Sequence, residues 1–150
     1  MPLYFLETSA LVKLYVQELG TEWLLQLASP AAGNQLAILS VAQVEFHSAV
    51  RRRMRDGDID EPAAEQILGN FGFHVSTRFL RQLANDAVLD LACKLIGRYP
   101  PRAYDAIQLA GCLILCSAAP EPPVFSCADR RLLEAAANEG LDCMDPAEYL

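Results

Sequence analysis

The sequence has 150 residues, of which 53% are hydrophobic and 21% are charged, and its formal net charge is −7. This length predicts a single domain over residues 1–150 with a core of useful size. The apolar content excludes a disordered chain, and 12 Lys and Arg against 19 Asp and Glu exclude a basic scaffold that holds nucleic acid by bulk charge.

Hydropathy and cysteine usage predict a cytoplasmic protein without a membrane span. The longest apolar run, residues 109–119, is shorter than the roughly 20 residues that a spanning helix needs. No basic segment precedes the apolar residues 3–6, so we expect no signal peptide. The five cysteines are an odd number in apolar surroundings, and we expect them to be reduced.

The N-terminal part of the chain predicts a strand followed by helices. Residues 3–6 are a short continuous apolar run, which is typical of a buried parallel strand. Thr8 or Ser9 is expected to cap the helix that follows, because both side chains can accept a bond from a free backbone amide. A second helical stretch begins at Thr21.

A second unit of strand and helix follows. Residues 36–39 are again a short apolar run and predict a strand. Ser40 with Gln43 three residues later matches the capping-box pattern, so a helix is expected over residues 41–55.

The middle of the chain is predicted to be helical. A helix begins at residues 60–62, where a proline stands near the first helical position, and is expected to fade through Gly69 and Gly72. Residues 73–75 predict a short extended segment, and residues 78–96 a further helix. The apolar stripe expected on this last helix is Leu83, Ala87, Leu91 and Leu95.

The C-terminal third returns to alternation. We expect an apolar helix over residues 103–116, a strand over 124–127, a helix over 130–138 and a final strand over 141–144. Strands that alternate with helices predict an α/β fold with a mainly parallel sheet. The consecutive helices between residues 60 and 116 are interpreted as a helical insertion or cover.

Four acidic residues stand in unusual surroundings. Glu7 and Asp129 each follow an apolar strand at its carboxyl end, where open α/β sheets bind their ligands. Glu45 lies inside an apolar helix among small residues, and Asp105 lies in the first turn of another. The remaining acidic residues, Glu18 among them, occupy turns and polar faces and are expected to be solvated.

Each of the four acids also has a structural alternative. Asp105 and Asp129 can serve their helix starts, and Glu45 can pair with Arg51 or Arg52. Together, however, four carboxylates at one end of a sheet would repel each other, and a divalent cation relieves that repulsion. Ligand sets made only of oxygen select Mg²⁺ or Mn²⁺.

Four segments carry a resemblance to a known family. They are residues 5–14, 40–45, 102–110 and 125–133, and the third is the most specific. In this order and spacing, over nearly the whole length, the sequence resembles the PIN domain, specifically the toxin nucleases of VapC type.

The resemblance implies a three-layer α/β/α sandwich and an endoribonuclease that uses Mg²⁺ or Mn²⁺ to hydrolyse phosphodiester bonds in RNA. The acidic cluster of the family corresponds to Glu7, Glu45, Asp105 and Asp129, with Ser9 as a supporting polar ligand. The resemblance also implies a homodimer and a small cognate antitoxin protein that silences the toxin.

Position 7 departs from the family pattern, in which the first acid is normally Asp. Glu7 is longer by one methylene, and Mg²⁺ tolerates little geometric error. The site has therefore adapted to Glu7, binds metal more weakly, or has lost activity. The alternative function is a catalytically impaired PIN-fold module that binds RNA or protein.

The basic residues offer candidate contacts to RNA. These are Arg51, Arg52 and Arg102, although arginines at the end of a helix also suit its dipole. Residues 78–116 carry more apolar surface than one small sheet covers, which independently predicts a homodimer.

Two other chemistries are disfavoured. His47 and His74 are the only histidines, and with no Ser–His–acid pattern around them both are expected to be structural. A phosphoacceptor receiver-like domain needs a lysine after a late strand, and neither Lys13 nor Lys94 meets that requirement.

Overall fold

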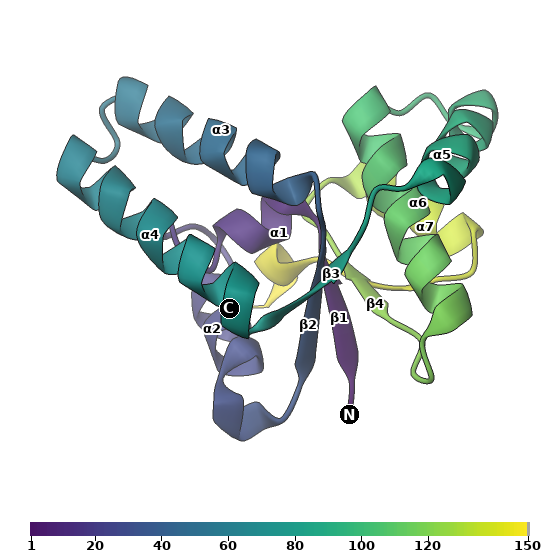
Figure 1. The fold of residues 1–150 in the computed structure, drawn as a ribbon, viewed down its shortest axis with the longest axis horizontal. Coiled ribbons are helices and arrows are strands. Elements are labelled where there is room, and N and C mark those ends of the chain that lie inside the picture. The colour runs from purple at the N-terminus through teal and green to yellow at the C-terminus, as the bar shows by residue number, and fades with distance from the viewer. Residues whose placement is uncertain (150) are drawn as a thin grey trace.

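A parallel β-sheet lies between two layers of helices (Figure 1). The computed structural model describes residues 1–149. The strands are β1 (Leu3–Leu6), β2 (Gln35–Leu39), β3 (Phe79–Gln82), β4 (Val124–Ser126) and β5 (Asp142–Met144). The α-helices are α1 (Thr8–Val12), α2 (Thr21–Ala28), α3 (Ala42–Arg55), α4 (Glu61–Thr77), α5 (Asp86–Arg98), α6 (Ala103–Ala118) and α7 (Arg130–Asn138). Two short 3₁₀ helices, η1 (Pro30–Ala32) and η2 (Pro146–Glu148), complete the described elements.

The sheet has the strand order β3-β2-β1-β4-β5, and every neighbouring pair is parallel. Phe5 on the central strand stands opposite Ala37 of β2 on one side and Phe125 of β4 on the other. The chain moves outward from β1 in one direction and later returns to add β4 and β5 in the other. This reversal places a topological switch point between β1 and β4, where open α/β sheets bind ligands.

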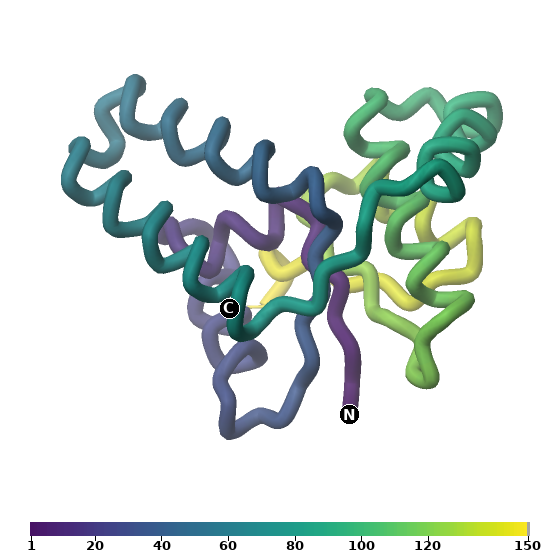
Figure 2. The backbone as a smooth tube through the Cα atoms, in the orientation of Figure 1, coloured from purple at the N-terminus to yellow at the C-terminus, as the bar shows by residue number. Residues whose placement is uncertain are grey.

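Both faces of the sheet are buried, as alternate side chains of each strand enter two different cores. Leu3 and Phe5 point into the core formed with α5, α6 and α7, whereas Leu6 points into the core formed with α1 to α4. Figures 1 and 2 show these two helical layers on opposite sides of the sheet. At Gly111 a Cβ atom would lie 2.5 Å from the Leu39 side chain, so glycine allows α6 to approach β2 closely. The three-layer α/β/α class is confirmed.

The helix predicted over residues 78–96 is wrong in its first part. Residues 79–82 form the edge strand β3, paired with β2, and α5 begins only at Asp86. Asn85 caps α5 by accepting a bond from the Val88 amide. The buried stripe of α5 is Val88, Ala92 and Leu95, while Leu83 is 54% exposed. The helical insertion expected between residues 60 and 116 is therefore interrupted by a strand of the main sheet.

The fading helix and extended segment expected around residues 69–75 are also wrong, because α4 continues to Thr77. Gly69 and Gly72 lie where an added Cβ would meet nothing within 4 Å, so they mark no close approach. Each glycine costs about 1 kcal/mol of helix propensity. The burial of Phe71, whose ring stacks on Phe46 at a centroid distance of 4.0 Å, offsets that cost.

Two helix starts differ from the expected caps. Glu7, rather than Thr8 or Ser9, caps α1 and accepts a bond from the Ser9 amide. Ser40 makes no capping box; its hydroxyl accepts a bond from the Ala84 amide and so connects the loop after β3 to the end of β2.

The cysteines of the described chain are all free, in agreement with the expected reduced state. Cys112 and Cys127 are buried, whereas Cys93 is exposed on α5. Within residues 1–149 we find no helix with the length and apolarity required to cross a bilayer.

Candidate functional site

The carboxyl ends of β1 and β4 lie side by side at one edge of the sheet. Leu6 stands opposite Ser126, and the Glu7 amide donates a hydrogen bond to the Ser126 carbonyl at 3.0 Å. The strand that precedes Glu7 and the strand that precedes Asp129 therefore end at the same place. This is the switch point of the sheet.

A pocket of about 890 Å³ opens at this edge. Three of the four acids, Glu7, Glu45 and Asp105, contribute to its lining. They come from the end of β1, from α3 and from the first turn of α6, so the fold brings together residues that are about 100 positions apart. Asp129 lines a neighbouring pocket together with Asp105.

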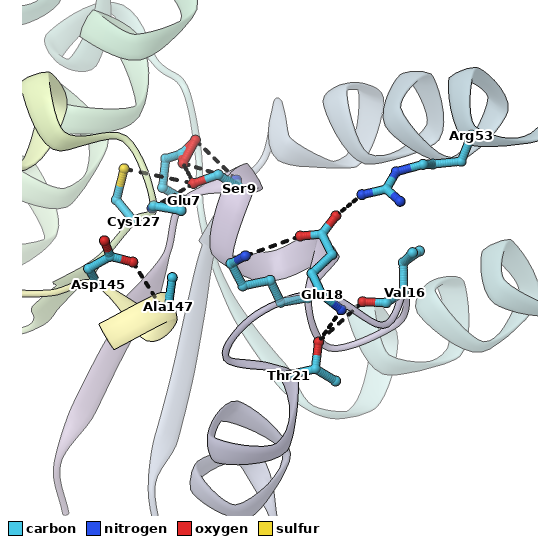
Figure 3. A network of polar contacts seen from close by, with 11 residues as sticks. Glu7, Ser9, Val16, Glu18, Thr21, Arg53, Cys127, Asp145 and Ala147 are labelled. Atoms are coloured by element: carbon cyan, nitrogen blue, oxygen red, sulfur yellow. Dashed lines mark hydrogen bonds and ion pairs between the residues drawn. The ribbon is translucent and has the colours of Figure 1, made fainter. Parts of the chain in front are cut away.

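Glu7 is the most buried of the four carboxylates, with 6% of its surface exposed. Its two oxygens accept bonds from the Ser9 amide at 3.1 and 3.0 Å, and Oε2 also accepts a bond from Ser9 Oγ at 2.7 Å (Figure 3). Ser9 Oγ in turn accepts a bond from the Ala128 amide at 2.9 Å, which connects α1 to the end of β4. Burial, with a smaller contribution from the charge of Glu45, raises the pKa of Glu7 to about 7 against the opposing effect of the hydrogen bonds from Ser9 and Cys127.

Glu45 is half-buried on α3 and accepts a hydrogen bond from Gln108 Nε2 at 2.9 Å. The same nitrogen donates to Thr8 Oγ1 at 3.0 Å, so one amide joins α6 to α3 and α1. Burial raises the pKa of Glu45, and the charge of Asp105 adds to the shift. The alternative pairing with Arg51 is not formed, since Arg51 binds Glu65 at 2.6 Å.

Asp105 and Asp129 lie at the starts of two helices. Burial raises the pKa of the half-buried Asp105, and the negative charge of Asp129 raises it further, against the opposing effect of the Arg102 guanidinium and amide. Asp129 caps α7, because its Oδ1 accepts bonds from the amides of Arg131 and Leu132 at 2.9 and 3.3 Å. The capping role that the sequence left open for Asp129 is thus present.

The four carboxylates form a chain in which three of them each raise the pKa of the next. Glu45 acts on Glu7, Asp105 acts on Glu45, and Asp129 acts on Asp105. Within residues 1–149, no three His, Cys, Asp or Glu side chains converge into a group that already has metal-holding geometry. Instead, three of the carboxylates bind nearby donors. The donor set itself consists of carboxylate oxygens, which suits Mg²⁺ or Mn²⁺.

The basic side chains divide into those at the pocket and those away from it. Arg52 and Arg102 line the pocket, whereas Arg51 does not. Sequence reasoning missed a second cationic group there: Lys13 Nζ lies 3.2 Å from Glu18 Oε1, and Arg53 forms an ion pair with the same carboxylate (Figure 3). The expectation that Glu18 is solvated is therefore wrong, because its carboxylate pairs with two cationic side chains.

Sequence reasoning also missed Gln108 and Cys127. Gln108 is fully buried, and its Oε1 is the one buried side-chain oxygen or nitrogen in residues 1–149 without a hydrogen-bond partner. A signal was present, because Gln108 is the single polar residue within the apolar stretch 106–110. Cys127 Sγ accepts a bond from the Asp129 amide at 3.2 Å, and burial raises the pKa of its thiol.

The two histidines lie outside this arrangement. His47 is exposed on α3. His74 lies on α4, and its Nδ1 is 2.6 Å from the Tyr15 hydroxyl. Neither lines the pocket.

Comparisons with known proteins identify a solved structure that has the same fold. The sequence matches no protein-family model, and a search of curated proteins finds no match. A chain in the crystal structure of VapBC2 from Rickettsia felis, bound to a DNA fragment from their promoter, superposes on this chain with a TM-score of 0.64. The two share a fold. The match covers 95% of this chain and 98% of that chain at 15% sequence identity, and it confirms the fold class predicted from the sequence.

Proposed function

We propose that this protein is a divalent-metal-dependent endoribonuclease and the toxin component of a toxin–antitoxin pair. The observation that carries the proposal is the placement of Glu7, Glu45 and Asp105 around one pocket at the carboxyl end of a parallel sheet. The resemblance to VapC-type nucleases and the fold likeness to VapBC2 favour an RNA substrate and a cognate antitoxin as partner.

In this proposal, Glu7, Glu45, Asp105 and Asp129 hold Mg²⁺ or Mn²⁺, and Ser9 supports Glu7. The cation, when bound, supplies an acidified water and offsets the charge of the scissile phosphate.

The chain's own residues position these groups. Ser9 and Gln108 hold two of the carboxylates in place through hydrogen bonds. The guanidinium groups of Arg52 and Arg102 at the pocket attract the phosphates of RNA, since charge-assisted hydrogen bonds to phosphate are strong. Arg51 is paired with Glu65, so in this proposal it contacts RNA only at the rim of the pocket.

The test is cleavage of RNA by the purified protein in Mn²⁺, with EDTA as the first control. Asp105→Asn is expected to lower the rate by more than about 100-fold, because even partners that only orient metal ligands are worth about 10–100-fold. Asp90→Asn, on the exposed surface of α5, is the matched control and should cleave at the wild-type rate. Wild-type cleavage by Asp105→Asn, with a circular dichroism spectrum unchanged, would show the site assignment to be wrong.

A second candidate, the impaired binding module, is favoured by one observation. Both oxygens of the Glu7 carboxylate accept bonds from Ser9, so a cation would compete with these bonds for the same oxygens. If this reading holds, the wild type binds RNA without cleaving it. Glu7→Asp, with its shorter side chain, should then restore cleavage.

We also propose a homodimer formed through α5. Leu89, Cys93 and Ile96 lie on one exposed face of this helix, with Leu89 42% and Ile96 47% exposed. Exposed apolar patches of this kind mark contacts between proteins. Light scattering should give about twice the 16.5 kDa of one chain. Ile96→Lys should yield a monomer, whereas Leu25→Lys on α2, with similar exposure, should remain a dimer.

A further inference from the structure

A second pocket of about 780 Å³ lies directly beside the acidic pocket. It is formed by the end of α5, the first half of α6 and one face of α7. Arg102 and Asp105 line both pockets, so the two meet at this pair of side chains. Each volume falls within the range of about 300–1,000 Å³ that is usual for sites that bind small molecules or single groups of larger ones.

Half of the residues that line the second pocket are apolar or aromatic. Leu95, Leu109 and Leu132 are buried side chains that contribute to the lining, and residues 99–101 close one side. The Tyr99 hydroxyl donates a bond to Glu139 at 2.7 Å, which fixes the orientation of the ring. Apolar and aromatic side chains are the groups against which proteins place unstacked bases of RNA.

The polar groups of the pocket are arranged along α7. Arg131, Glu134 and Asn138 are spaced by three and four residues and therefore share one face of the helix. Arg102, Arg130 and Arg131 are exposed, and none has an ion-pair partner in the described chain. The pocket thus offers guanidinium groups near the acidic site and hydrogen-bonding groups, Glu134 and Asn138, further along.

We propose that this second pocket binds one unpaired nucleotide of the RNA, next to the phosphate that lies at Asp105. The inference rests on the proposed function for the choice of RNA as the substrate. The base lies against the apolar wall with its edge toward Glu134 and Asn138, and Arg102 and Arg131 contact the adjoining phosphate. A base held in a duplex cannot turn into such a pocket, so the preferred substrate is RNA that is unpaired beside the cleaved bond.

The experiment uses a set of short RNAs in which the base is removed at one position at a time around the cleavage point. For the wild type, loss of the base that enters the pocket should lower kcat/KM by roughly tenfold, since stacking of one base is worth about that much or more. Asn138→Trp fills the pocket from an exposed position and should erase this penalty while raising KM for intact RNA. Arg131→Ala should weaken binding of every RNA.

Arg55→Ala is the matched control, because Arg55 is an exposed arginine that lines neither pocket. Binding of labelled RNA in EDTA is measured in parallel by fluorescence anisotropy. If Asn138→Trp keeps the wild-type penalty and wild-type binding, the inference is wrong even though RNA is cleaved. If no RNA is cleaved at all, the proposed function fails, and the anisotropy decides the inference: weaker binding by Asn138→Trp supports it and unchanged binding overturns it.

Discussion

The four carboxylates fall into two pairs that are held in different ways. Glu7 and Glu45 are buried or half-buried, and side-chain donors on α1 and α6 bind them. Asp105 and Asp129 stand at the starts of α6 and α7, and in residues 1–149 no side chain of another element donates a hydrogen bond to either carboxylate; the amides of α7 bind Asp129. The first pair therefore depends on how several elements pack together, whereas the second pair depends on local structure. Substitutions of neighbouring residues should damage the first pair far more.

The largest expected effect concerns the burial of Glu7. Its pKa is about 7 in the folded protein and 4.5 in the unfolded reference, so the folded state binds more protons between these values. The contribution of Glu7 to stability is therefore fully present below pH 4.5 and is lost as pH rises through 7, a loss of about 3 kcal/mol. Glu7→Gln should remove this part of the pH dependence. Urea unfolding of both proteins in EDTA at pH 5 and pH 8 measures this change. The same change in the free energy of unfolding between the two pH values for wild type and Glu7→Gln would contradict it.

Loss of the Gln108 side-chain amide, which joins α6 to α1 and α3, should reduce RNA cleavage. Gln108→Met keeps the length and volume of the side chain but removes the donor to Glu45 and Thr8. We expect cleavage and Mn²⁺ affinity to fall by about 10–100-fold, the usual cost of losing a group that orients a metal ligand. The melting temperature should change little, because an apolar group replaces a buried amide whose oxygen has no partner.

Gln66→Met, exposed on α4, is the control for this substitution and should behave as the wild type. If Gln108→Met and Gln66→Met bind Mn²⁺ equally well, Gln108 does not position Glu45.

The same division explains what the sequence could predict. Helix starts and apolar runs are local, and from them the strands β1, β2 and β4 and the positions of Asp105 and Asp129 were predicted. The edge strand β3 has the burial pattern of one buried, two exposed and one half-buried residue, so no apolar run marks it. The contacts of Gln108 with Glu45 and of Arg53 with Glu18 join distant segments, and no local spacing contains them.

A smaller effect is expected when Glu7 is shortened. Glu7→Asp should tighten Mg²⁺ binding several-fold if the longer side chain turns back to Ser9 at the expense of the cation. For the wild type, Mn²⁺ should support cleavage better than Mg²⁺, because Mn²⁺ stands above the alkaline-earth ions in affinity for such ligands. Titration calorimetry of both proteins compares them. Equal or weaker Mg²⁺ binding by Glu7→Asp would mean that the site has adapted to Glu7.

The smallest effect is expected for Asp129, whose carboxylate is bound by the amides of its own helix. Asn caps helices about as well as Asp, so Asp129→Asn should change the free energy of unfolding by less than about 0.5 kcal/mol. Asp129→Ala should cost about 1 kcal/mol, since the amides of Arg131 and Leu132 lose their acceptor. Chemical denaturation of the three proteins measures this. A larger loss in Asp129→Asn would show that Asp129 is held by more than its own helix.

In the proposed function, the carboxylates of Glu7, Glu45, Asp105 and Asp129 serve a divalent cation at the carboxyl end of the sheet. Crystals grown with Mn²⁺ test it directly through the anomalous signal of the metal. We expect a peak in the pocket within coordination distance of the Asp105 and Glu45 carboxylates, with the Glu7 carboxylate or a water bound to it on the same ion. A map without such a peak at saturating Mn²⁺, or a peak only at exposed surface acids, would contradict it.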